Sequence, residues 1–66
     1  MPFIEVKDLT GKEWILNTDV ISHVEPVSGD WKHGGTIYLK TEITDGRKAI
    51  NVPDKRIKKF IKELLG

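Results

Sequence analysis

The last stretch of the chain, residues 51–66, constrains the fold most, because it carries a regular amphipathic pattern. Apolar residues recur there at intervals of three and four, which places them on one face of an α-helix. Pro53 or Asp54 suits the first turn of such a helix, and Gly66 suits its end. A helix this short is marginal alone in water, so its apolar face requires a surface to pack against. The residues of that face are Ile57, Phe60, Ile61, Leu64 and Leu65.

The preceding residues predict that surface as a set of short β-strands. Gly11 lies in a turn between the first two strands, and the dipeptide Asp45-Gly46 between the last two is a strong hairpin signal. In the third strand Ile21 and Val24 have opposite parity, so a bulge or a late strand start is expected. Pro26 removes a backbone donor, which places that strand at a sheet edge or ends it. The expected strands cover residues 3–9, 13–17, 21–27, 36–44 and 47–52, the fourth with the clearest alternation.

These elements predict a single α+β domain over residues 1–66. The sheet, about residues 3–52, is expected to be a strongly twisted antiparallel meander of five strands, covered by a helix over about residues 54–65. The pattern leaves open whether the sheet closes into a barrel. The predicted core consists of Ile4, Val6, Leu16, Val24, Ile37, Leu39, Ile50, Val52, Ile57, Phe60, Ile61 and Leu64.

Composition narrows the class of protein. The chain has no cysteine, which rules out disulfides and thiolate metal sites. It has no apolar run long enough to span a membrane and no signal-peptide pattern at its start, so we expect a cytoplasmic protein with no membrane insertion. Residues 1–53 hold six basic and eight acidic residues, whereas residues 54–66 hold five and two. The helix is therefore basic, and a solvated lysine face is the favoured interpretation over a dedicated anion site.

The sequence offers little for catalysis or metal binding. Ser22 and Ser28 lie in no nucleophile motif, and a chain this short has little room for a closed pocket. His23 and His33 are ten residues apart without the spacing of a metal site. The glycines of the loop 28–35 precede no phosphate-binding motif. We therefore predict no enzymatic activity, no metal and no cofactor.

Binding is the remaining class of function, and two kinds of partner are open. Another protein is favoured, because small sheets leave unpaired edges that pair with other chains, including a second copy. Trp14 and Trp31 are candidate interface anchors, although core membership for Trp14 and a lid over the core for Trp31 are slightly favoured. Nucleic acid is the alternative, since aromatic rings stack on bases and cations neutralise phosphates. The candidate binding surface comprises Trp31, Lys32, His33, Tyr38, Arg47, Lys48, Lys55, Lys59 and Lys62.

The order of motifs adds a resemblance. The run from Leu9 to Glu25, followed by Thr36-Ile37-Tyr38-Leu39, Asp45-Gly46-Arg47-Lys48, Ile50-Asn51-Val52 and the helix, resembles the FlbD/SwrD family of small bacterial flagellar and swarming-motility proteins. The loop 28–35 and the stretch 41–44 are longer than in that family's pattern, and the helix is more basic. The same order resembles, more weakly, the second half of LytTR-type DNA-binding domains. The first resemblance implies a non-catalytic adaptor or accessory role in flagellar motility through another protein; the second implies a small nucleic-acid-binding regulator.

Overall fold

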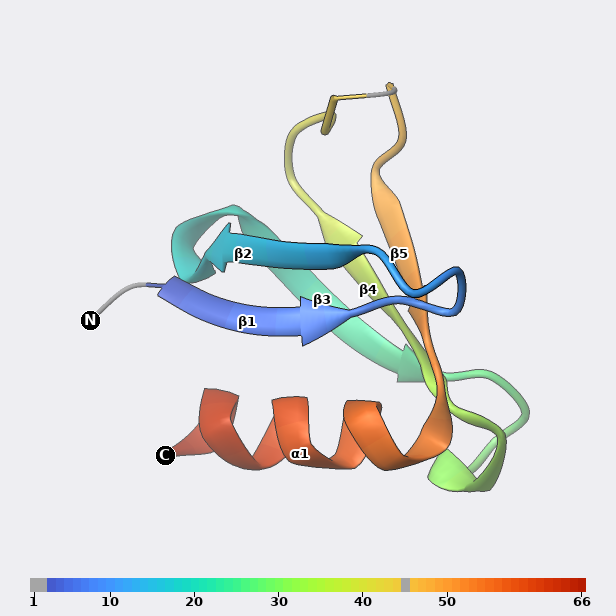
Figure 1. Ribbon diagram of the computed structural model, residues 1–66. Helices are drawn as coiled ribbons and strands as arrows, with labels where there is room; N and C mark the ends of the chain where they lie inside the picture. Colours follow the sequence, from blue (N-terminus) through green and yellow to red (C-terminus); the bar gives the residue numbers. More distant parts are fainter. Residues whose placement is uncertain (1–2, 45) are drawn as a thin grey trace.

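The computed structural model describes residues 3–44 and 46–66, which form five antiparallel strands and one C-terminal helix (Figure 1). The expected α+β class is confirmed. The five strands divide between two sheets, β1-β2 and β3-β4-β5, and these sheets do not close into a barrel. The elements are β1 (Phe3–Lys7), β2 (Glu13–Asn17), the 3-10 turn η1 (Thr18–Val20), β3 (Ile21–Pro26), the 3-10 turn η2 (Trp31–His33), β4 (Gly35–Leu39), β5 (Ala49–Val52) and α1 (Asp54–Leu65).

The β1-β2 hairpin lies across the three-stranded sheet, and α1 runs beneath the hairpin (Figure 1). A backbone hydrogen bond joins the hairpin to the three-stranded sheet, since Leu9 N donates to Asn51 O of β5 at 3.0 Å. Lys40 N donates to Val20 O at 2.7 Å, which continues the pairing of β3 with β4 into η1. The helix packs against β1 and η2. The apolar inner faces of both sheets and of α1 thus enclose one core.

The three-stranded sheet follows the sequence pattern with shorter strands than predicted, and its fifth strand, predicted over 47–52, begins at Ala49. The pairing of β3 with β4 shifts between Ile21 and His23, so the expected bulge is present, and β3 ends at Pro26 as an edge strand. The predicted fourth strand over 36–44 was too long, because β4 ends at Leu39. Beyond it the chain forms an irregular loop in which Ile43 N donates to Arg47 O at 2.8 Å. Of the predicted Asp45-Gly46 turn, Asp45 lies outside the described residues.

Most of the predicted core is confirmed. Nine of its twelve residues are buried, among them Ile57 and Phe60 of α1. The other three, Val24, Ile61 and Leu64, are half-buried and pack against the nine. Each of the three has one side toward the core and another toward a groove between β3 and α1, which is described below.

The N-terminal turn of α1 agrees with the sequence pattern. Pro53 precedes the first helical residue with an extended backbone, φ −68° and ψ 164°. At the other end Gly66 adopts φ 84°, a conformation that side chains beyond glycine rarely take, and its N–H donates to Glu63 O. The helix therefore begins and ends where the sequence predicted.

Candidate functional site

The nine residues of the predicted binding surface do not form one surface. Lys32 and His33 are exposed on η2, and Tyr38 is half-buried on the outer face of β4. Arg47 and Lys48 are exposed in the loop before β5, which lies at the opposite end of the molecule from α1 (Figure 1). The exposed helix lysines, Lys55, Lys59 and Lys62, are thus remote from that loop.

Trp31, the remaining residue of that set, is half-buried and packs against the core. A Cβ atom on Gly35 would lie 2.7 Å from Cζ3 of the Trp31 ring, so the ring sits closely over the start of β4. The η2 turn that carries Trp31 is capped by Asp30, whose carboxylate accepts a hydrogen bond from Lys32 N at 2.9 Å. The side chain therefore serves as a lid on the core, and its outer side also lines the groove beside β3.

Asp8 is the one charged residue buried in the described chain, and it organises the β1-β2 turn. Its Oδ1 accepts hydrogen bonds from Thr10 Oγ1 at 2.6 Å, Thr10 N at 2.9 Å and Lys12 N at 3.0 Å, and its Oδ2 accepts one from Trp14 Nε1 at 3.0 Å. The bonds from Thr10 Oγ1 and Trp14 Nε1 hold the pKa of Asp8 well below its usual range, against the desolvation that raises it. With its oxygens engaged in this way, Asp8 is a structural carboxylate.

Trp14 is held in the same network. Its indole N–H is bound by Asp8, Lys12 Nζ lies 4.4 Å from the ring centroid, and the half-buried ring packs against the core. A tryptophan fixed on both sides has little freedom to act as an anchor for a partner. The structure places Trp14 as a half-buried residue against the core, which is close to the core role that the sequence slightly favoured.

A second polar cluster lies on the outer face of the three-stranded sheet. His23 Nδ1 is 3.0 Å from Ser22 Oγ, and His23 Nε2 is 3.1 Å from Glu25 Oε2. The ring of His23 stacks on Tyr38, with centroids 4.7 Å apart. The residue types match a serine–histidine–carboxylate relay, but the side chains of His23 and Glu25 are 52% and 57% exposed. Such exposure leaves the relay in water, without the shielded surroundings in which these groups activate a nucleophile.

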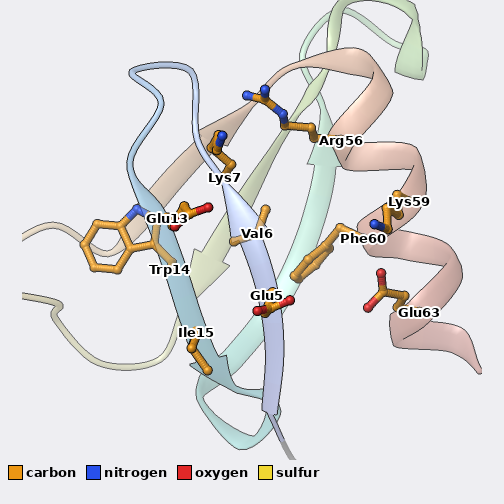
Figure 2. A pocket seen from close by; sticks show the side chains of 10 residues that line it. All are labelled: Glu5, Val6, Lys7, Glu13, Trp14, Ile15, Arg56, Lys59, Phe60 and Glu63. Atoms are coloured by element: carbon orange, nitrogen blue, oxygen red, sulfur yellow. The ribbon is translucent and has the colours of Figure 1, made fainter.

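A charged groove of about 440 Å³ separates the β1-β2 hairpin from α1 (Figure 2). In Figure 2, Lys59 and Glu63 project from the helix beside β1, and Val6 faces Phe60 at the base. Three carboxylates and three cations line the walls, so their charges offset one another. Within residues 3–44 and 46–66, no ion pair joins these six groups. The groove is lined by Glu5, Val6, Lys7, Glu13, Trp14, Ile15, Arg56, Lys59, Phe60 and Glu63.

A second groove, of about 300 Å³, lies between β3 and the C-terminal half of α1. Its helix wall is apolar, and the ring of Trp31 contributes to it from η2. Four consecutive residues of β3, 21–24, line the other wall; because side chains alternate along a strand, the edge of β3 and not one face alone borders the groove. We call this the apolar groove; it is lined by Thr18, Ile21, Ser22, His23, Val24, Trp31, Ile61, Leu64 and Leu65.

Sequence reasoning missed the apolar groove. Two signals pointed toward it: the irregular parity of Ile21 and Val24, and a helix stripe wider than the core needs. Leu65, at the margin of that stripe, is 81% exposed. Among the described strands β3 pairs only with β4, so its other edge is open on the side of the groove.

Comparisons of the chain with protein-family models, curated proteins and solved structures found no match. In the part of the chain that the structure describes, no group of three or more histidine, aspartate or glutamate side chains is arranged to hold a metal ion. No helix among the described residues has the length and apolar character needed to cross a membrane.

Proposed function

We propose that this chain is a cytoplasmic, non-catalytic protein-binding module that captures an extended segment of another protein in the apolar groove. The observation that carries the proposal is the position of this groove beside the open edge of β3. An extended segment that lies along such an edge gains backbone hydrogen bonds, and its side chains enter the adjacent apolar space. The edge of β3 would thus bind the backbone of the segment, and the groove would bind its side chains.

The edge itself limits the length of segment that can pair. The bulge near Ser22 interrupts the regular ladder at one end, and Pro26, which has no N–H, interrupts it at the other. Regular pairing is left for His23, Val24 and Glu25. We therefore expect a short bound segment and a modest affinity, about micromolar.

The absence of a role in catalysis is part of the proposal, and two observations support it. Asp8, whose pKa is strongly shifted, already binds the groups of its own turn. Ser22, His23 and Glu25 are exposed to water, although Ser22 and His23 also border the apolar groove. Catalytic sites ordinarily place a group with a shifted pKa inside a cleft that excludes water. In this chain Asp8, the group whose pKa is shifted, lines neither of the two grooves.

The identity of the partner rests on the resemblance to the FlbD/SwrD family. On that basis we propose that the partner belongs to the bacterial flagellar machinery and that the chain is an accessory factor in motility. Binding of nucleic acid is the alternative. It has less support, because the loop that carries Arg47 and Lys48 lies at the opposite end of the molecule from α1 (Figure 1). In addition, Glu25 is bound to His23, whose ring stacks on Tyr38.

The proposal is tested by selecting random heptapeptides that bind the full chain and measuring their affinity for a Leu65→Ser variant. Leu65 is 81% exposed, so the substitution should change the free energy of unfolding by less than about 0.5 kcal/mol. Removing its apolar contact with a bound segment should weaken binding roughly tenfold.

Lys59→Ser, which lies in the charged groove, is the matched control and should bind the same peptides as the unaltered chain. Equal binding by the Leu65→Ser variant would show that the peptides dock elsewhere. The salt dependence of binding distinguishes a nucleic-acid partner from a protein partner. Binding of labelled oligonucleotides should weaken steeply with added salt if phosphates are contacted, whereas binding of an apolar peptide should not.

A further inference from the structure

Two exposed lysines of α1, Lys58 and Lys62, lie on the helix next to the wall of the apolar groove, outside its lining. On an α-helix, residues three, four and seven positions apart lie on the same side. Lys62 and Lys58, three and seven positions before Leu65, therefore border the exposed Leu65 and the groove. Both lysines are exposed, and within the described residues neither makes a hydrogen bond or an ion pair.

Within the described residues no carboxylate forms an ion pair with these lysines, and Asp54, four positions before Lys58 in the first turn of α1, is the acidic residue on the same side of the helix. Glu63, the acidic residue of the last turns of α1, lines the charged groove on the other side of the helix (Figure 2). Glu25 is engaged by His23 on the strand side, at 3.1 Å. Asp19 follows Thr18, at the far wall formed by η1 and β3. The rim of the apolar groove is therefore basic along α1, on the side opposite to β3.

A second copy of this chain is a poor occupant. A two-fold interface built on this groove uses the same patch of both copies, so it would gather Lys58 and Lys62 of both chains into one interface. Like charges gathered in this way repel and lower affinity. Complementarity instead favours a chain that supplies carboxylates.

We infer that the apolar groove accepts an extended, acidic segment of a different protein, in which apolar side chains alternate with aspartate or glutamate. This inference rests on the proposed function. Alternation sends every second side chain to the same face of a strand. The apolar side chains enter the groove against Trp31, Ile61 and Leu64, and the carboxylates on the outer face reach Lys58 and Lys62.

The test uses three fluorescein-labelled peptides with valine at alternate positions and aspartate, serine or lysine at the intervening ones. Fluorescence anisotropy gives their affinities for the full chain at low and moderate salt. We expect the aspartate peptide to bind about tenfold more tightly than the lysine peptide at low salt, with the serine peptide between them. Replacing both groove lysines, Lys58→Gln and Lys62→Gln, should weaken binding of the aspartate peptide about fivefold.

Arg56→Gln with Lys59→Gln is the matched control, because it removes the same charge from the same helix at the charged groove. It should leave the affinity within about twofold. Thermal unfolding of both double variants, followed by circular dichroism, checks that α1 remains intact.

The outcomes separate the inference from the proposed function. If all three peptides bind equally and Leu65→Ser abolishes binding, the groove is a peptide site and the acidic preference is wrong. If no peptide binds, or Leu65→Ser has no effect, the proposed function fails as well.

Two further outcomes would replace the acidic segment by another occupant. Light scattering detects a dimer, and a dimer that becomes more stable with Lys58→Gln and Lys62→Gln would overturn the inference in favour of a second copy. A labelled single-stranded oligonucleotide tests nucleic acid. If it binds, if those two substitutions abolish its binding, and if the three peptides bind equally, the inference is overturned in favour of nucleic acid.

Discussion

Asp8 is the residue on which the first hairpin depends most. A buried carboxylate is costly unless its oxygens are hydrogen-bonded, and here the donors come from Thr10, Lys12 and Trp14. The backbone also closes the turn, since Asp8 N donates to Lys12 O and Gly11 N donates to Asp8 O, both at 3.0 Å. One side chain thus fixes the turn and the orientation of a core tryptophan together.

Substituting Asp8→Asn should lower the free energy of unfolding by about 2 kcal/mol, because it removes charged hydrogen bonds and places an amide N–H₂ beside donors. The folded-state pKa of Asp8 is depressed below its usual value of about 3.8. Ionised Asp8 therefore contributes stability that is fully present above about pH 4 and is lost as the pH falls through the folded-state pKa.

Urea unfolding between about pH 2 and pH 7 checks this prediction, since the variant should lose less stability on acidification than the unaltered chain. An identical pH dependence in both proteins would contradict it.

Gly35 is the second residue with a specific structural demand. A Cβ atom there would approach Trp31 Cζ3 at 2.7 Å, Ile57 Cγ1 at 2.9 Å and Glu25 O at 3.0 Å. Gly35→Ala should therefore lower the free energy of unfolding by about 1–3 kcal/mol through overpacking. Chemical denaturation measures the change. A change in the intrinsic fluorescence of the folded protein should accompany it, because the Trp31 ring must move. Unchanged stability would show that the ring is not seated against β4.

At the scale of the element, the apolar stripe of α1 has two environments, one in the core and one open to water. Ile57 is fully buried against the sheets, whereas Leu65 belongs to the same apolar pattern and is 81% exposed. The amphipathic pattern predicts both as one face, because it reports spacing and not what lies opposite each residue. The part of the apolar stripe that extends beyond the core forms the helix wall of the apolar groove.

Ile57→Ala should lower the free energy of unfolding by about 2–5 kcal/mol, through lost burial and a cavity in the core. Leu65→Ala, the matched substitution on the same helix, should change it by less than about 0.5 kcal/mol. Thermal unfolding of the two variants measures the contrast. Comparable losses would mean that Leu65 is covered in the folded protein, and the apolar groove would then not be open.

At the scale of the whole molecule, the two sheets and the helix share one core. Ile4 and Leu16 from the hairpin lie in the same buried cluster as Ile37 and Ile50 from the three-stranded sheet and Phe60 from α1. A hairpin of two strands is marginal alone, so its stability derives from these contacts. We therefore expect the whole chain to unfold in one transition.

The two tryptophans test this expectation, since Trp14 lies in the hairpin and Trp31 lies between the sheet and α1. In variants with a single tryptophan, Trp14→Phe and Trp31→Phe, fluorescence and circular dichroism should give the same denaturant midpoint within each variant. Separate midpoints for the two signals would show that the hairpin unfolds apart from the rest.

Local features of the fold were predictable from the sequence because they depend on neighbouring residues. The alternation around Ile37 and the spacing from Ile57 to Leu64 predicted the type of element. Opposite parity at Ile21 and Val24 predicted a bulge or a late strand start, and the register shift between Ile21 and His23 corresponds to the bulge. The end of β4 at Leu39 was not predictable, because residues 40–44 retain a strand-like pattern while the partner strand begins only at Ala49.

The sequence alone determined the α+β class, most of the core and the basic character of the helix, since periodicity and side-chain chemistry are local properties. Tertiary structure alone decided that the strands divide into two sheets, that Trp31 covers the core beside Gly35, and that the predicted cations are dispersed. It also decided where the apolar groove lies. Such a groove arises where the edge of β3 and the margin of α1 fail to meet, and that gap depends on how elements distant in sequence pack around one core.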